Sequence, residues 1–92
     1  MLRITVIEST ASSKKFKLEG RVTSASADEL RQLCERMLTH NGHDTLTLDC
    51  ADVSFIDHEG IELLRSLGRY DVVATNCSSF VSELLKGVLP CS

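Results

Sequence analysis

The amino-acid sequence predicts a single α/β domain: a small mixed β-sheet covered by helices, with an N-terminal antiparallel hairpin followed by alternating β/α units. Near the N-terminus, two segments alternate apolar and polar residues across a short polar loop. Further along, three segments repeat apolar residues at helical spacing, and a strand-like segment precedes each of them. The 92 residues are enough for one hydrophobic core and too few for two domains, so the domain spans 1–92.

The hairpin is predicted from its two alternating segments, 2–8 and 15–22. In the second, Phe16 and Leu18 share one face and charged residues the other. The loop between them is too short for the crossover that parallel neighbours require. Gly20 marks either a bulge or the strand end. The first strand would be an edge, where a second copy could pair to give a homodimer.

The first helix is predicted to start with a capping box, formed by Ser26 and by Glu29 three residues later. Its buried stripe would consist of Leu30, Leu33, Cys34, Met37 and Leu38. Residues 41–42 would end it. His40 and His43 flank this end, either as a metal pair without an obvious third ligand or as cations that complement the helix dipole.

The central segment, 45–68, is predicted to form a strand, a short connection and a helix. Leu46 and Leu48 alternate with polar residues, as in a strand with one buried face. The connection returns to the core before Asp57, which is a good N-cap type. The helix buries Ile61, Leu63, Leu64 and Leu67 and stops at Gly68. The residues expected in the core are Leu33, Leu48, Phe55, Ile56 and Leu64.

The last segment is predicted to add a strand over 70–74 and a helix capped by Ser78 or Ser79. Its buried side would comprise Phe80, Val81, Leu84, Leu85 and Val88. Gly87 and Pro90 would close that helix.

Composition excludes several function classes. The formal charge of −3, the three Phe, the single Tyr and the lack of Trp argue against nucleic-acid binding. No apolar run is long enough for a membrane span, and the N-terminus lacks signal-peptide features, so we expect a cytoplasmic protein. The four cysteines lack C-x-x-C spacing and are expected to be reduced thiols without a metal or redox role. No cofactor or metal is predicted.

The central segment resembles the signature of STAS domains, the family of bacterial anti-sigma-factor antagonists and of the cytoplasmic tails of sulfate transporters. The matching residues are Leu46, Leu48, Asp49, Val53, Phe55, Ile56, Asp57, Gly60, Ile61 and Leu64. Segments 18–22 and 78–89 also resemble the family, so the similarity covers nearly the whole chain. The resemblance implies the mixed sheet described above and non-catalytic protein binding.

The resemblance also implies a regulatory position. In antagonists of this family a partner kinase phosphorylates the Ser or Thr directly before the glycine. Here that position is Glu59, and His58 precedes it, so the hydroxyl is absent. One carboxylate at a helix N-terminus could partly imitate phosphate. The alternative is that Glu59 is a helix-favourable first-turn acid worth about 0.3–1 kcal/mol.

The resemblance implies a partner-binding surface made of Asp57, His58, Glu59, Gly60, Glu62 and Arg65. The expected partner is an anti-sigma factor of the serine-kinase type. The alternative is a STAS subunit of a bacterial lipid-transport ABC complex, and the third class is an enzyme or small-ligand sensor. We expect no enzyme, because three consecutive side chains at a helix start point in different directions, and no catalytic motif accompanies them.

Overall fold

The computed structural model describes residues 2–10, 13–38, 45–69 and 71–91. In chain order, the elements are β1 (Leu2–Ser9), β2 (Ser13–Val22), α1 (Ser24–Leu38), β3 (Thr45–Ile56), α2 (His58–Ser66), a 3₁₀ turn (Leu67–Arg69), β4 (Asp71–Thr75) and α3 (Ser79–Leu84). This order confirms the predicted fold class. His40, residues 41–42, His43 and Tyr70 lie outside the described residues, as do the side chains of Met37 and Leu38.

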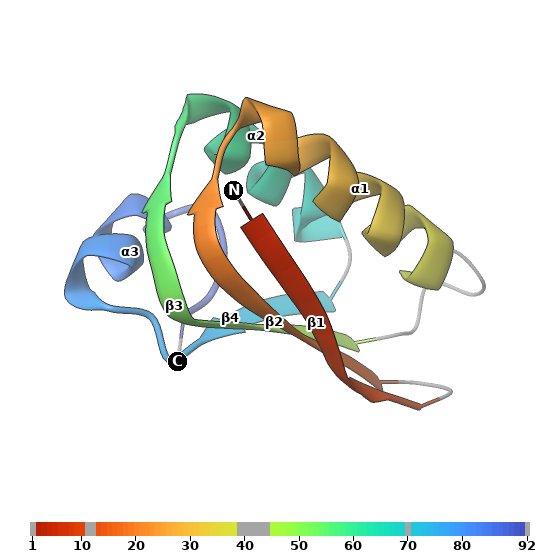
Figure 1. Cartoon of the computed structure of the whole chain (residues 1–92). Helices are drawn as coiled ribbons and strands as arrows, with labels where there is room; N and C mark the ends of the chain where they lie inside the picture. Colours follow the sequence, from red (N-terminus) through yellow and green to blue (C-terminus); the bar gives the residue numbers. More distant parts are fainter. Residues whose placement is uncertain (1, 11–12, 39–44, 70, 92) are drawn as a thin grey trace.

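The sheet is mixed and has the strand order β1-β2-β3-β4 (Figure 1). β1 and β2 form the predicted antiparallel hairpin, whereas β2, β3 and β4 run parallel. The central register places Phe16 of β2 opposite Leu48 of β3. Leu48 in turn lies opposite Ala74 of β4. Phe16, Leu48 and Ala74 are all buried, so this row across the three parallel strands lies in the core.

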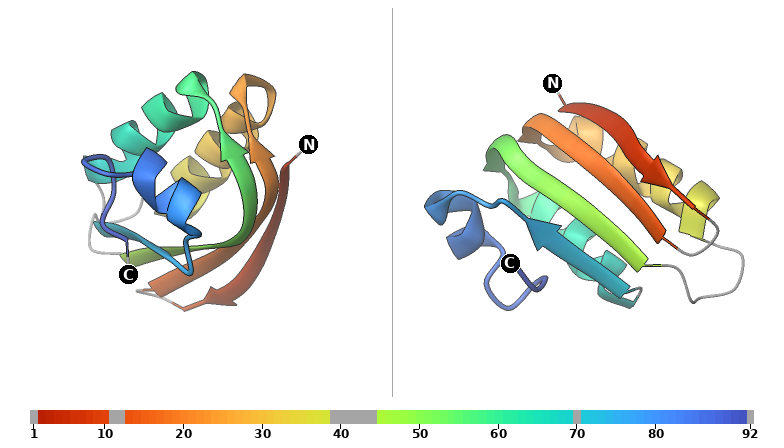
Figure 2. Two further views of the ribbon diagram at one scale, coloured as in Figure 1. Left: turned by 90° about the vertical axis from the view of Figure 1, so that its left-hand side faces the viewer. Right: turned by 90° about the horizontal axis from the view of Figure 1, so that it is seen from below.

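Two helices lie along the same face of this sheet. Figure 1 shows α1 and α2 together on that face, and the second view of Figure 2 shows the strands in front of both helices. Side chains of β2 alternate accordingly: Phe16 and Leu18 are buried, while Lys15 and Lys17 are only partly covered. α3 sits beyond β3 and β4 at one end of the layer, and its Val81 and Leu85 are buried.

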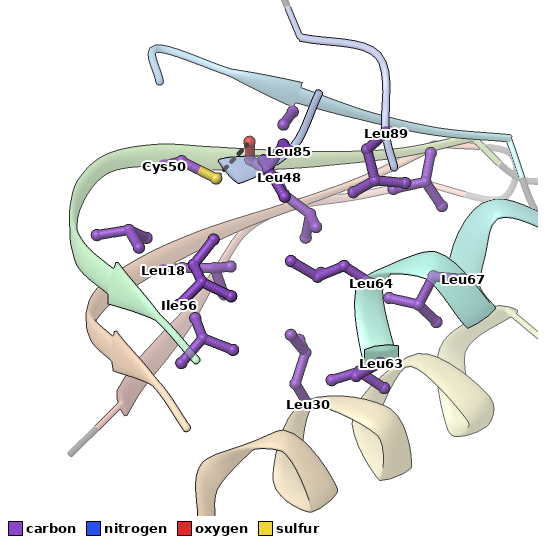
Figure 3. Packing of buried hydrophobic residues seen from close by; sticks show 14 of the residues in the cluster. Leu18, Leu30, Leu48, Cys50, Ile56, Leu63, Leu64, Leu67, Leu85 and Leu89 are labelled. Atoms are coloured by element: carbon purple, nitrogen blue, oxygen red, sulfur yellow. Dashed lines mark hydrogen bonds between the residues drawn. The ribbon is translucent and has the colours of Figure 1, made fainter. Parts of the chain in front are cut away.

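The core lies between the sheet and the helices. Figure 3 shows Leu30 of α1 near Leu63 of α2, with Leu64 reaching toward the sheet. The predicted burial of Leu48, Ile56 and Leu64 is confirmed. Leu33 is only partly buried against this core. Cys34 is fully buried, as expected for a small core residue.

β3 is longer than predicted. The connection expected between the alternating stretch around Leu48 and the cap at Asp57 is itself strand as far as Ile56, so β3 has 12 residues. Its pairing with β2 shifts register twice, once on each side of Gly20, whose φ is 104°. Gly20 thus belongs to an irregular stretch inside the strand, which decides between the two readings of it. The shifts place Phe55 opposite Arg21 and leave its side chain 36% exposed, so its predicted burial is wrong.

The start of α1 differs from the prediction. The helix begins at Ser24, and the amide of Ala27 already donates to Thr23 O at 2.7 Å. Ser26 is therefore inside the first turn, where its Oγ accepts from the Thr23 amide at 2.9 Å. The predicted capping box is wrong because Ser26 is not the N-cap. It sits three residues after Thr23 and accepts from the Thr23 amide, which is the role of the second residue of a capping box. The predicted cap at Asp57 is confirmed, and of the two candidates for α3 the structure selects Ser78.

Candidate protein-binding site

The turn between β3 and α2 is held by one carboxylate. Asp57 Oδ1 accepts from the Gly60 amide at 2.8 Å, which is the N-cap bond of α2. Its Oδ2 accepts from the Ser24 amide, at the first residue of α1, at 3.1 Å. Asp57 therefore satisfies one donor at each of two helix starts, and it ties them together. Its own amide donates to Val22 O at 3.0 Å, which anchors the turn to the end of β2.

Gly60 lets α2 approach the sheet. It is buried, and a Cβ placed there would lie 2.7 Å from Val22 O and 2.9 Å from Ile56 Cγ2. Any larger residue at this position would have to displace backbone as well as side chain. Of the residues predicted to contact a partner, Gly60 therefore contributes close packing and leaves the exposed contacts to its neighbours.

The remaining predicted residues form an exposed ridge. His58, Glu59, Glu62 and Arg65 are all exposed along α2. Arg65 Nε lies 3.9 Å from Glu62 Oε1, one turn earlier on the same helix. The structure thus brings these four side chains to one helix, next to the Asp57 turn.

A groove between α1 and α2 continues this ridge. It encloses about 260 Å³ and is lined by Ser24, Asp28 and Arg31 of α1 and by Glu59, Glu62 and Ser66 of α2, among others. Arg31 forms an ion pair with Asp28 on its own helix. The lining thus carries three carboxylates, from Asp28, Glu59 and Glu62, and one guanidinium, from Arg31, so we call it the acidic groove.

Comparison with known families identifies the chain. A family model described as "Mlab, STAS domain" matches residues 6–86 of the 92. This chain is a STAS domain. Among individually curated proteins none matches.

Solved structures resemble the STAS domain over nearly its full length. The anti-sigma-factor antagonist SpoIIAA in its unphosphorylated form superposes with a TM-score of 0.78 at 14% identity, covering 98% of this chain and 87% of its own. An anti-sigma-factor antagonist from Mycobacterium paratuberculosis superposes with a TM-score of 0.74 at 15% identity, covering 99% of this chain and 85% of its own. The phosphorylated form of Bacillus SpoIIAA superposes with a TM-score of 0.69 at 15% identity, covering 98% of this chain and 91% of its own. At these identities the likeness shows the fold.

The polar side chains around the Asp57 turn of the STAS domain serve mainly its backbone. STAS domains are generally non-catalytic. Within residues 2–10, 13–38, 45–69 and 71–91, no cluster of His, Cys, Asp and Glu is placed to hold a metal ion. Both carboxylate oxygens of Asp57, the residue before His58, accept hydrogen bonds from backbone amides. In the same ranges no helix is long and apolar enough to cross a membrane.

Sequence reasoning missed one exposed cluster of the STAS domain. Phe55 and Phe80 were predicted to be buried, but they stack with ring centroids 6.3 Å apart and are 36% and 52% exposed. Arg21 Cζ lies 5.7 Å from the Phe55 centroid, within cation–π range. In the sequence, Gly20 is the signal of the irregular β2–β3 register, but a glycine does not predict which face of the sheet Phe55 lies on.

Proposed function

We propose that this STAS domain is a non-catalytic protein-binding module that acts as an anti-sigma-factor antagonist, or a relative of one, in the bacterial cytoplasm. Its contact surface is the Asp57 turn with His58 and Glu59, continued along α2 by Glu62 and Arg65. The observation that carries the proposal is the position of Glu59, exposed in the first turn of α2 and on the rim of the acidic groove.

The charge at Glu59 gives this surface a fixed state. A phosphate would bring about −1.5 to −2 charges and three acceptor oxygens, whereas a carboxylate brings one charge and two oxygens. Both are favoured by the positive end of a helix dipole. The chain therefore carries part of a phosphorylated site's charge at all times, without a hydroxyl that a kinase could modify at this position.

The acidic groove indicates the chemistry of the partner. Glu59 and Glu62 line this groove from α2. Arg31 is paired with Asp28 and Glu62 with Arg65, each on its own helix, and the lining keeps an excess of carboxylates. A partner that supplies Lys or Arg side chains here would gain complementary contacts, and an acidic surface would be repelled. We propose an anti-sigma factor of the serine-kinase type that presents such a basic patch.

The test is binding and phosphate transfer. The tagged chain captures its partner from native lysate, the kinase is purified, and it is titrated with wild type, Glu59→Ser and the matched control Glu62→Ser. We expect wild type to bind and take up no phosphate. Glu59→Ser should become a substrate and change affinity by about two- to fivefold, because one exposed first-turn carboxylate contributes about 0.3–1 kcal/mol.

The control separates position from composition. Glu62→Ser also exchanges an exposed acid for a hydroxyl on α2, but one turn further from the helix start, so it should stay unphosphorylated. Phosphate on wild type at Ser54, with loss of binding, would show that this turn is still under phosphate control and would contradict the proposal. Equal binding of all three proteins, with no phosphate on any, would leave Glu59 as a helix-start acid.

A second candidate is a STAS subunit of a bacterial lipid-transport ABC complex. The family description that matches this chain names Mlab and not an antagonist, which favours keeping this class beside the first. It predicts the same docking surface but a different captured protein, an ATPase of a transporter. In that case Glu59→Ser would weaken or strengthen binding without becoming a phosphate acceptor.

A further inference from the structure

Three thiols gather where the C-terminal segment returns to the sheet. Cys50 comes from β3, Cys77 precedes the N-cap of α3, and Cys91 lies beside β4. The sulfur atoms of Cys77 and Cys91 are 3.8 Å apart. Cys91 pairs with Ala74, whose amide donates to Pro90 O at 2.9 Å, so the C-terminal segment is positioned by backbone contacts as well as by its thiol.

The accessibility of the thiols separates them. Cys34 and Cys50 are buried, and burial raises the pKa of each thiol to about 12, so neither forms the reactive thiolate readily. Cys77 is half-buried, and burial with the neighbouring Cys91 thiol raises its pKa to about 11. Cys91 is exposed. Of these four side chains, Cys91 is the one that a soluble oxidant reaches first.

We propose that Cys77 and Cys91 are an oxidation site that closes into an intramolecular disulfide when the protein meets a hydroperoxide. A disulfide needs its sulfur atoms about 2.0 Å apart, so the pair must approach by less than 2 Å. Both residues lie outside the helices and named strands, in the segments before α3 and after it, so the approach changes no regular element.

The reaction balances with one hydroperoxide. The Cys91 thiolate attacks a peroxide oxygen, which gives a sulfenic acid and releases the reduced alcohol or water. The Cys77 thiolate then attacks the sulfenic sulfur, the S–S bond forms, and the hydroxyl group leaves as water. Each thiol loses one proton and one electron, and the hydroperoxide accepts both electrons. The raised pKa of Cys77 slows its attack, and its contact with Cys91 compensates through proximity.

Closure would fasten the C-terminal part of the domain. The disulfide would enclose α3 and join the two ends of the segment that packs Val81 and Leu85 into the core. A cross-link of this kind restricts the unfolded chain and so stabilises the folded one. The oxidised domain should therefore unfold at a higher temperature than the reduced domain.

The experiment treats the purified full chain with hydrogen peroxide, blocks remaining thiols and maps the peptides by mass spectrometry. The wild type and the control Cys34→Ala should form the Cys77–Cys91 link, with loss of two hydrogen atoms and a Tm raised by about 5 °C or more. A thiol reductant should reverse both changes. Cys77→Ser and Cys91→Ser should show neither change, and circular dichroism of the reduced variants checks that they fold.

Three results would overturn the proposal. One is a link between Cys50 and Cys77, which would make the buried thiol the partner. Another is a disulfide-linked dimer through Cys91 without the internal link. The third is overoxidation of Cys91 while Cys77 stays reduced. Because the wild-type peptide map distinguishes all of these, the result does not depend on how well the variants fold.

Discussion

Single residues in the Asp57 turn have separate tasks. Asp57 uses both carboxylate oxygens on backbone amides, one from α2 and one from α1. Gly60 has no side chain, and this allows α2 to pack closely against Val22 and Ile56. These two residues build the turn, while the exposed His58 and Glu59 between them are available to a partner. The two outer positions of this four-residue segment therefore hold the turn, and the two inner ones are exposed.

Gly60→Ala should destabilise the domain. The added Cβ would lie within 3 Å of Val22 O and of two side-chain atoms, and overpacking of this kind costs about 1–3 kcal/mol. Gly68→Ala is the matched control, because a Cβ at that position meets nothing within 4 Å. Urea unfolding of both variants measures the difference. Equal stability of the two would mean that α2 does not sit as close to β2 as the structure has it.

At the scale of elements, the first turn of α1 depends on a residue inside it. Ser26 Oγ accepts from the Thr23 amide and lies 3.2 Å from the carbonyl oxygens of Arg21 and Thr23, to which it can donate. Glu29 is exposed and belongs to the next turn. Of the two residues that suggested a capping box, Ser26 and Glu29, only Ser26 takes part in the helix start, and its side chain is buried.

Ser26→Ala should cost about 0.5–2 kcal/mol, the usual range for loss of a helix-capping bond. Glu29→Ala should change stability by less than about 0.5 kcal/mol, as exposed substitutions generally do. Thermal unfolding of the two variants, followed by circular dichroism, makes the comparison. A larger effect of Glu29→Ala would restore the capping box that the sequence suggested.

At the scale of the whole molecule, the described residues place a hydrophobic core apart from two features of the surface. The core fills the layer between the sheet and its helices (Figure 3). The acidic groove lies between α1 and α2. The stacked pair joins Phe55, near the end of β3, to Phe80 of α3. Whether an apolar side chain contributes much to the stability of this domain therefore depends on whether it lies in the core or on the surface.

Leu64→Ala should cost about 2–5 kcal/mol, because the side chain is 2% exposed and its loss leaves a cavity in the core. Phe80→Ala removes a larger side chain but should cost less, about 0.5–1.5 kcal/mol, the value of an aromatic pair. Its exposed fraction of 52% leaves little burial to lose. Denaturant unfolding midpoints compare the two, and an equal or greater loss for Phe80→Ala would place that ring in the core.

The order of elements, the hairpin and the caps at Asp57 and Ser78 were readable from the chain. Each depends on residues within a few positions of one another, where periodicity and capping preference act directly. The STAS family was readable for the same reason, since its signature lies in one continuous segment. The proposed role of Glu59 as the substitute for a phosphorylated residue stays a prediction that binding experiments must test.

The exposure of Phe55, the double capping by Asp57 and the contact between Cys77 and Cys91 were not readable. The first depends on two register shifts between β2 and β3, and one extra residue turns a side chain to the other face of a sheet. The other two join residues 33 and 14 positions apart in the chain. Contacts between residues so far apart in the chain depend on how whole elements pack, and local sequence preferences do not predict them.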